Sequence, residues 1–179
     1  MSEFYNMTIA GVDCALEKFA VSDTLDIAAF ICFDSVEVTV AGCTELLKRV
    51  PEFDVILTPE AKSIPIAYEL ARQSGKPYVI ARKGVKVYMR IPLDVAVTSI
   101  TTQHEQHLFL GEREVQKLRG KRVLIVDDVI STGESLVAVR KLVAEAGGIE
   151  AAACAFLAEG DAANRTDIIF LEKLPLFFK

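Results

Sequence analysis

The sequence lacks any apolar segment long enough to span a membrane. Its longest apolar runs are Ile27–Phe33 and Ala151–Ala158, whereas a membrane-spanning helix needs about 20 mostly apolar residues. The N-terminus also lacks a basic stretch followed by an apolar one, which is the pattern of a secretory signal peptide. From these two absences we expect a cytoplasmic protein that has no membrane partner.

Cysteine pairs with the spacing of a metal or redox site are also absent. The four cysteines have mostly apolar neighbours and form no Cys-x-x-Cys: Cys14, Cys32, Cys43 and Cys154. Free cysteine behaves as a small apolar residue and is often buried. We therefore expect buried free thiols in a reducing compartment, which agrees with a cytoplasmic location.

A basic excess and the glycine-rich signatures of common nucleotide-binding folds are missing too. The net charge is −5, which argues against non-specific binding to nucleic acid. No Gly-x-x-x-x-Gly-Lys-Ser/Thr occurs, and the three spaced glycines of a dinucleotide fingerprint are absent. We expect no nucleic-acid partner, no P-loop and no dinucleotide-binding turn.

The residues that are present suffice for one α/β domain. Of 179 residues, 51% are hydrophobic and 25% are charged, as in ordinary soluble domains. Short apolar runs alternate with helical patterns, which favours a mostly parallel twisted sheet flanked by helices. The clearest strands are continuously apolar, as in sheets covered on both faces: Val55–Thr58, Tyr78–Ala81, Val123–Val126 and Ala151–Leu157. The clearest helices run from about Ile64 to Gln73 and from about Glu134 to Ala146.

Two regions are less regular. The segment from Lys83 to Leu110 has strand-like pieces at Val85–Ile91 and Val95–Ile100, followed by polar residues. We expect an excursion from the sheet that is partly a hairpin and partly loosely held, because few apolar residues near 101–106 can anchor it. The stretch Asp23–Phe33 is compatible with helix, strand or both.

The segment Val123–Ser135 combines a buried strand, two acids and a hydroxyl-rich turn before a helix. Open α/β sheets place ligand sites at the carboxyl ends of their strands, where Asp127 and Asp128 stand. The first amides of the following helix have no intrahelical partner, and the helix dipole favours an anion there. Gly133 lets the backbone approach a ligand, and hydroxyls of nearby residues add donors. Because carboxylates accept hydrogen bonds from sugar hydroxyls, the segment suits a ribose 5-phosphate.

Two other interpretations of this segment do not involve a sugar phosphate. An acid pair after a strand also begins a response-regulator receiver domain, but too few residues follow Asp128 for that fold. A purely structural strand–turn–helix explains the apolar residues. It does not explain two adjacent acids and three hydroxyls in one turn.

The same segment resembles the signature of the type I phosphoribosyltransferases, which bind 5-phosphoribosyl 1-diphosphate (PRPP). The pattern is an apolar strand, two acids, two apolar residues, then a small residue, Thr and Gly. Glu134 and Ser135 depart from it, since Gly and Thr are common at these places. The resemblance implies that Asp127 and Asp128 hold the ribose, and that one of them takes a proton from the base. It assigns the 5-phosphate to the turn and the helix start: Ser131, Thr132, Gly133, Glu134 and Ser135.

Two upstream stretches resemble the adenine and xanthine enzymes of this family. Glu60-Ala61-Lys62-Ser63 looks like their Glu-Ala-Arg-Gly loop, which often contains a non-proline cis peptide, here expected near Lys62–Ser63. Ala81-Arg82-Lys83-Gly84-Val85-Lys86 looks like their Arg-Lys-x-x-Lys. The resemblance assigns the diphosphate of PRPP to five residues: Lys62, Ser63, Arg82, Lys83 and Lys86. Taken alone, an ordinary helix start and a cationic surface turn remain the alternatives.

The resemblance implies a Mg²⁺-dependent purine phosphoribosyltransferase with a single domain over residues 1–179. About residues 1–50 and 158–179 would form a small hood over the base, with Val129 or Ile130 as an apolar floor beneath it. Mg²⁺ would arrive with PRPP, and no protein side chain is assigned to it. Adenine is the first expected base, xanthine the second, and a homodimer the expected assembly. The alternative function is a regulatory protein that senses PRPP without catalysis.

Two further features carry open interpretations. His104 and His107 flank Glu105 in an i, i+3 pattern that can ligate a metal, although a solvated loop is the simpler explanation. Phe30 or Phe33 can stack on a base, and core packing explains both equally well.

Overall fold

The computed structural model describes residues 3–98 and 105–179. Within these residues, the helices are α1 (Val36–Arg49), α2 (Ile64–Ser74), α3 (Glu112–Leu118) and α4 (Glu134–Glu145), with short 3-10 helices η1 (Cys32–Asp34) and η2 (Gly160–Asn164). The strands are β1 (Phe4–Ile9), β2 (Val12–Ser22), β3 (Leu25–Ala29), β4 (Val55–Pro59), β5 (Tyr78–Ala81), β6 (Leu93–Thr98), β7 (Glu105–Leu110), β8 (Arg122–Ile130), β9 (Ile149–Glu159), β10 (Ile169–Leu174) and β11 (Phe177–Phe178). No described helix is long and apolar enough to cross a membrane.

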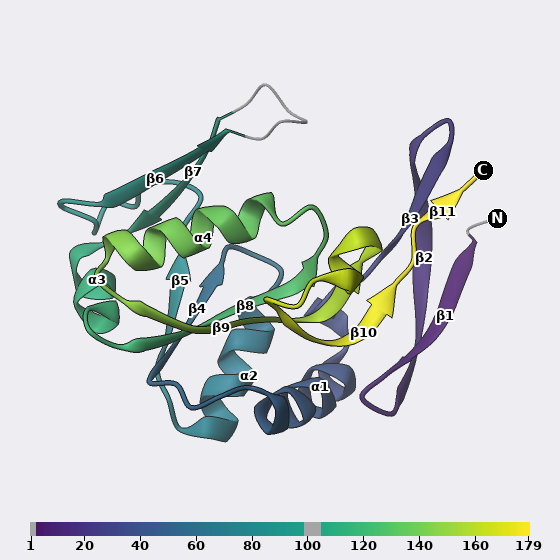
Figure 1. Ribbon diagram of the computed structural model, residues 1–179, viewed down its shortest axis with the longest axis horizontal. Coiled ribbons are helices and arrows are strands. Elements are labelled where there is room, and N and C mark those ends of the chain that lie inside the picture. Colours follow the sequence, from purple (N-terminus) through teal and green to yellow (C-terminus); the bar gives the residue numbers. More distant parts are fainter. Residues whose placement is uncertain (1–2, 99–104) are drawn as a thin grey trace.

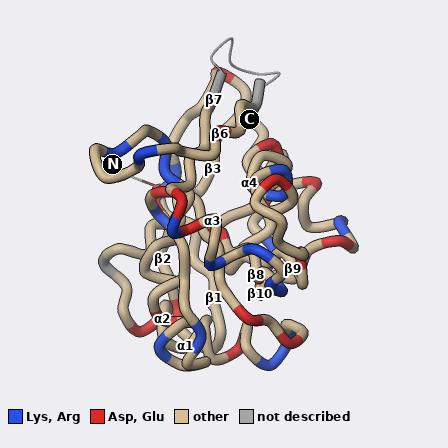
Figure 2. The backbone as a smooth tube through the Cα atoms, turned by 90° about the vertical axis from the view of Figure 1, so that its left-hand side faces the viewer, with Lys and Arg blue, Asp and Glu red and all other residues tan. Residues whose placement is uncertain are grey.

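Five strands form the central sheet, in the order β10-β9-β8-β4-β5. Every neighbouring pair in it is parallel. Helices α1 and α2 cover one face and α4 covers the other (Figure 1). The predicted α/β class, with a mostly parallel sheet flanked by helices, is confirmed. Basic and acidic positions are interspersed along the described chain (Figure 2).

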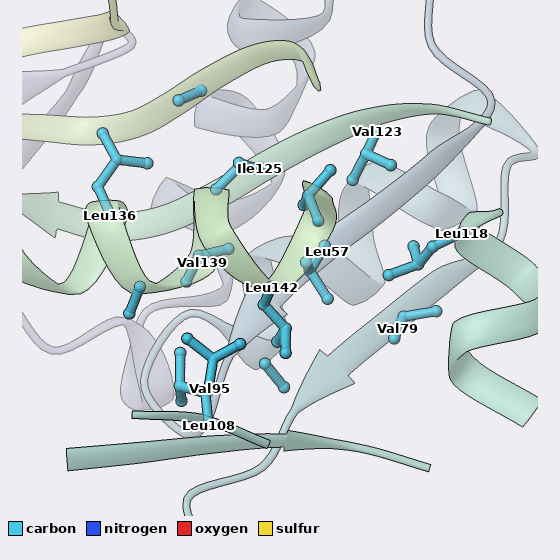
Figure 3. Packing of buried hydrophobic residues seen from close by; sticks show 14 of the residues in the cluster. Leu57, Val79, Val95, Leu108, Leu118, Val123, Ile125, Leu136, Val139 and Leu142 are labelled. Atoms are coloured by element: carbon cyan, nitrogen blue, oxygen red, sulfur yellow. The ribbon is translucent and has the colours of Figure 1, made fainter. Parts of the chain in front are cut away.

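The middle strand, β8, is buried on both faces. Val123 and Ile125 pack toward α4 (Figure 3), whereas Leu124 and Val126 belong to the cluster under α1 and α2. None of these four side chains is more than 2% exposed. Double burial explains why the strand is continuously apolar rather than alternating. The strand is longer than predicted, since pairing with β9 continues to Ile130.

A hairpin of β6 and β7 packs over the outer side of α4. Val95 and Leu108 point toward Leu142 of this helix (Figure 3) and are almost fully buried. The predicted hairpin is confirmed, and its strands are anchored in the core. The part expected to be loosely held, near 101–106, lies mostly outside the described residues. The predicted strand at Val85–Ile91 is wrong, because this stretch forms turns and bends. The tip, residues 99–104, lies outside the described residues.

A second, antiparallel sheet joins the two ends of the chain. Its order is β1-β2-β3-β11, and Phe177 of β11 pairs with Asp26 of β3. The ambiguous stretch Asp23–Phe33 thus contains both a strand, β3, and the short helix η1. This sheet lies at one end of the molecule, beside β10 (Figure 1).

Helix α1 approaches β9 closely because residue 42 is glycine. A Cβ added at Gly42 would collide with the ring of Phe156, whose side chain is fully buried. The ring also packs against Phe30, with ring centroids 6.0 Å apart. The missing side chain at Gly42 therefore sets the distance between the helix and the sheet.

We predict that Gly42→Ala lowers the free energy of unfolding by about 1–3 kcal/mol, the usual cost of overpacking. This cost exceeds the gain of roughly 0.5–1 kcal/mol that alanine brings to a helix interior. Urea denaturation measures the difference. Gly84→Ala is the control, because its Cβ meets no atom within 4 Å. A Gly42→Ala protein as stable as the wild type would contradict the prediction.

Candidate active site

A cavity of about 440 Å³ opens at the carboxyl ends of β4 and β8. These ends lie side by side, since Val55, Ile56 and Leu57 of β4 pair with Val123, Leu124 and Ile125 of β8. The cavity brings together nine of the fourteen residues predicted for the site: Lys62, Ser63, Lys83, Asp127, Asp128, Val129, Thr132, Glu134 and Ser135. The ligand position expected for an open parallel sheet is thus the position of the cavity.

The two acids occupy the last part of β8 rather than a loop after it. The backbone N–H of Asp128 donates to Oδ1 of Asp127 over 2.9 Å. Asp128 is only 4% exposed, and its Oδ2 lies 2.8 Å from Nζ of Lys62. A carboxylate this deeply buried is costly without a compensating charge. Lys62 therefore balances Asp128 across the cavity.

Asp127 is half-buried, and no cation of the described residues forms an ion pair with it. Burial, together with the neighbouring Asp128 carboxylate, raises the pKa of Asp127 to about 7. A carboxyl group that changes protonation near neutral pH is suited to accept a proton during a reaction. The geometry thus separates the roles of the two acids, with Asp128 ion-paired and Asp127 able to exchange a proton.

The turn after β8 leads directly into α4. Gly133 is the N-cap residue, with φ +83°, a backbone conformation that glycine adopts without steric cost. The hydroxyl of Thr132 accepts a hydrogen bond from the backbone N–H of Glu134 at 3.5 Å. Thr132, Glu134 and Ser135 all line the cavity. The start of α4 therefore adjoins the acids, as an anion-binding helix start requires.

The loop after β4 contains a non-proline cis peptide, but at Glu60–Ala61. The predicted position, near Lys62–Ser63, is wrong by two residues. Ser63 is buried, accepts a hydrogen bond from Thr58 at 2.7 Å and donates one to the carbonyl of Pro59 at 3.2 Å. These internal bonds fix the loop under the cavity, and Thr58 has no role in the sequence-based prediction.

The predicted diphosphate cations do not all reach the cavity. Lys62 and Lys83 line it, whereas Arg82 and Lys86 are not among its lining residues. Arg82 instead donates to Glu60 over 2.9 Å and to the hydroxyl of Tyr88 over 3.3 Å. Glu60 also accepts a hydrogen bond from the backbone N–H of Lys83, which holds the pKa of this carboxyl below its usual value. Glu60 therefore connects the loop after β4 to the cationic turn.

Several other predicted residues have different surroundings from those expected. Ile130 is a core residue, 3% exposed in the cluster beneath α4, and does not line the cavity. Val129, the other residue predicted for the floor of a base site, lines it. His107 contacts Asp94, with Nδ1 to Oδ1 at 2.8 Å, while His104 lies outside the described residues. Phe30 is buried, and Phe33 is exposed.

The cysteines follow the expected pattern. All four are thiols that form no disulfide bond within the described residues, and Cys32, Cys43 and Cys154 are buried. Burial raises the pKa of the Cys154 thiol to about 12, which disfavours a reactive thiolate. Cys32 also touches the site loop, since its thiol donates to the carbonyl of Lys62 over 2.8 Å. No sequence pattern indicates this contact.

The raised pKa of Asp127 predicts a pH-dependent stability. Between about pH 4, where an unfolded Asp ionises, and pH 7, the native state binds a proton that the unfolded state releases. Wild-type stability therefore falls as pH rises through this window. Asp127→Asn lacks the effect, so its Tm relative to wild type should increase from pH 4 to pH 7 and stay level above. Calorimetric Tm values at each pH measure this, and a pH-independent difference would exclude the raised pKa.

The Lys62–Asp128 pair predicts a coupling between two substitutions. Lys62→Ala leaves a buried carboxylate uncompensated and should cost about 1–3 kcal/mol of unfolding free energy. In an Asp128→Asn background the same change should cost much less, because no buried charge remains. Urea denaturation of the two single variants and the double variant measures the coupling. Additive effects would show that the two groups do not interact in solution.

Comparison with known proteins agrees with this geometry. A hypoxanthine/guanine phosphoribosyltransferase of Methanothrix thermoacetophila is 34% identical over 119 residues, 65% of this chain and 59% of that protein. An adenine phosphoribosyltransferase of Thermosipho africanus is 33% identical over 123 residues, 66% of each chain. The chain thus matches a little less than two thirds of the length of these relatives.

The fold has a similar solved counterpart. The crystal structure of adenine phosphoribosyltransferase from Thermoanaerobacter pseudethanolicus superposes with a TM-score of 0.65 and 26% identity, covering 82% of this chain and 95% of that one. The family profile described as the phosphoribosyl transferase domain matches residues 39–173. This range contains the acids, the turn before α4 and both upstream loops. The chain belongs to the phosphoribosyl transferase domain family.

Proposed function

We propose that this chain transfers the 5-phosphoribosyl group of PRPP to a purine base and releases diphosphate. One observation carries the proposal: Asp127, Asp128 and the start of α4 share a cavity with Lys62 and Lys83. A binding site for PRPP needs three kinds of group: acids that accept hydrogen bonds from the sugar hydroxyls, amides that bind the 5-phosphate, and cations that bind the diphosphate. Membership of the family makes this combination more specific than a generic phosphate site.

In this proposal each part of PRPP has its own partner. The amides and hydroxyls of Thr132, Gly133, Glu134 and Ser135, with Ser131 beside them, bind the 5-phosphate. Asp127 and Asp128 accept hydrogen bonds from the ribose hydroxyls. Lys62, Ser63 and Lys83 hold the diphosphate. Arg82 and Lys86 contribute only after a movement of the turn that carries them.

The reaction is a substitution at the anomeric carbon. A nitrogen of the base forms the new bond to this carbon while the carbon–oxygen bond to diphosphate breaks, and diphosphate leaves with the electron pair. The nitrogen gives up its proton, and Asp127 is placed to accept it. Protein groups mainly position the reactants and stabilise charge. Closure of the protein around the anomeric carbon would exclude water from the reaction.

The donor set fits a Mg²⁺ ion that arrives with PRPP. Mg²⁺ is usually bound by substrate phosphates, several waters and one or two carboxylates. Asp127 and Asp128 offer such carboxylate oxygens at the cavity, for direct contact or contact through the waters. When bound, Mg²⁺ would offset the negative charge of the diphosphate.

Adenine is the base that we propose first. The solved structure that covers 82% of this chain at 26% identity is an adenine phosphoribosyltransferase, and one relative with 33% identity has the same name. Hypoxanthine and guanine form the second group, because relatives with 34% and 38% identity carry those names. Xanthine, the second base expected from the sequence, completes the set to be tested.

We also propose a homodimer. The turn region after β5 exposes several large apolar side chains that a second copy would cover: Val85, Val87, Tyr88 and Ile91. The cationic residues Arg82 and Lys86 belong to the same region, so an interface here would lie close to the site.

The test is to incubate the protein with PRPP, Mg²⁺ and each of the bases adenine, hypoxanthine, guanine and xanthine, and to detect nucleotide and diphosphate. We expect turnover with at least one purine, fastest with adenine, and none without Mg²⁺. Binding of PRPP without turnover of any base would favour the alternative of a regulatory PRPP sensor. Absence of PRPP binding would overturn the proposal.

Asp127→Asn is the matched variant for this assay, since it keeps the shape and removes the charge. A hydrogen bond to a charged group is worth about 1.5–3 kcal/mol, so we expect kcat/KM for PRPP to fall by about tenfold to a hundredfold. Unchanged kinetics would remove Asp127 from the site.

A further inference from the structure

Arg165 lies directly against the turn that precedes α4. It follows η2, on the crossover from β9 to β10. A Cβ added at Gly133 would collide with Nη1 of Arg165, and the Cζ of the guanidinium is 3.4 Å from the same position. The guanidinium thus fills the space in which a side chain of residue 133 would project. The left-handed φ and this packing are two independent reasons for glycine at this position.

The guanidinium of Arg165 is held in place by hydrogen bonds to Asp167. Nε and Nη2 of Arg165 donate to the two carboxylate oxygens of Asp167, at 2.9 and 2.7 Å. Asp167 is fixed in turn by Arg140 of α4, whose Nη1 lies 2.6 Å from Oδ2. A bidentate arginine–carboxylate pair has a defined geometry. The remaining Nη1 edge therefore faces Gly133 as a consequence of the network, and the side chain is only 27% exposed.

The position of the Arg165 guanidinium matters because the cavity lining contains more acids than cations. Its lining contains four acids, Glu60, Asp127, Asp128 and Glu134, and two lysines. Lys62 and Lys83 come from the loops after β4 and β5, and Lys62 is paired with Asp128. At the turn before α4 the lining contributes Glu134, an acid. Arg165, which does not line the cavity, brings a positive charge next to that turn.

We propose that Arg165 is a positioning residue for the 5-phosphate end of the site. Its guanidinium fixes the backbone of Gly133, so that the following amides face the cavity, and places a positive charge behind them. Nothing in the geometry requires Arg165 to touch the ligand. This inference rests on the proposed function, because it takes a sugar 5-phosphate as the ligand of the turn.

The test uses calorimetric titration of the full chain with ribose 5-phosphate and, separately, with diphosphate and Mg²⁺. We expect Arg165→Gln to weaken ribose 5-phosphate binding by about tenfold, the size expected for loss of one nearby charge at a partly exposed site. Diphosphate affinity should stay unchanged, because its cations lie on other loops. A variant that is merely misfolded would lose both ligands.

Two further variants separate positioning from general stability. Arg165→Lys keeps the charge but loses the bidentate pair with Asp167, so it should restore part of the ribose 5-phosphate affinity, with the salt dependence of the wild type. Arg140→Gln removes the second partner of Asp167 but leaves the bidentate Arg165–Asp167 pair, and should weaken ribose 5-phosphate binding less than Arg165→Gln does. Both variants can be measured even if the Arg165→Gln protein does not fold.

The outcomes distinguish the two proposals. Wild-type protein that binds neither ligand overturns the proposed function, and this inference with it. Wild-type protein that binds both, together with unchanged ribose 5-phosphate affinity in Arg165→Gln, overturns this inference alone. Equal losses for both ligands in Arg165→Gln and Arg165→Lys would also overturn it, since they would indicate a general structural role.

Discussion

The parallel pairing of β8 with β4 on one side and β9 on the other determines where the site lies. Because the middle of β8 is covered on both faces, residues 123–126 are apolar, and the acids stand at the point where the strand reaches the cavity. That point is the carboxyl end, where Asp127 and Asp128 follow Val126. The same pairing places the loop after β4 next to the acids. Chain connectivity alone then brings the acids, the start of α4 and Lys62 around one cavity.

Burial at this end of the sheet gives the two adjacent carboxyl groups different properties. Asp128 is almost inaccessible and depends on Lys62 at 2.8 Å. Asp127 keeps some access to solvent and has a raised pKa. Two like charges so close together cannot both be ionised without cost. A cationic ligand or a metal ion at the cavity would lower that cost, and an anion bound by Lys62 would compete with Asp128 for the lysine. Binding of substrate and protonation of the acids are therefore coupled.

The parts of the structure that depend on local sequence could be predicted, and the parts that depend on distant contacts could not. Continuous apolar runs identify β4, β5, β8 and β9, and the strand–acid–turn–helix order of Val123–Ser135 identifies the site. Strand β3 pairs with β11 from the other end of the chain, and no local pattern shows this. Ile130 is buried because β8 continues past the two acids, whereas the apolar run predicts a strand that ends before them. Glu60 was part of a quoted motif, but its role depends on Arg82 and Lys83, which lie on another strand end.

The turn before α4 shows how this chain accommodates its departure from the family pattern. Glu134 replaces a glycine that is common in the family, and an acid in the first turn is favourable for the helix dipole but unfavourable for a nearby phosphate. Gly133 cannot relieve this conflict by carrying a polar side chain, because its φ is positive and Arg165 occupies the space. Arg165, on the crossover between β9 and β10, brings a cation next to this turn and is not among the residues that line the cavity. Asp167 and Arg140, which do not line the cavity, hold the Arg165 guanidinium in place. The negative charge of Glu134 is therefore offset without a substitution in the turn itself.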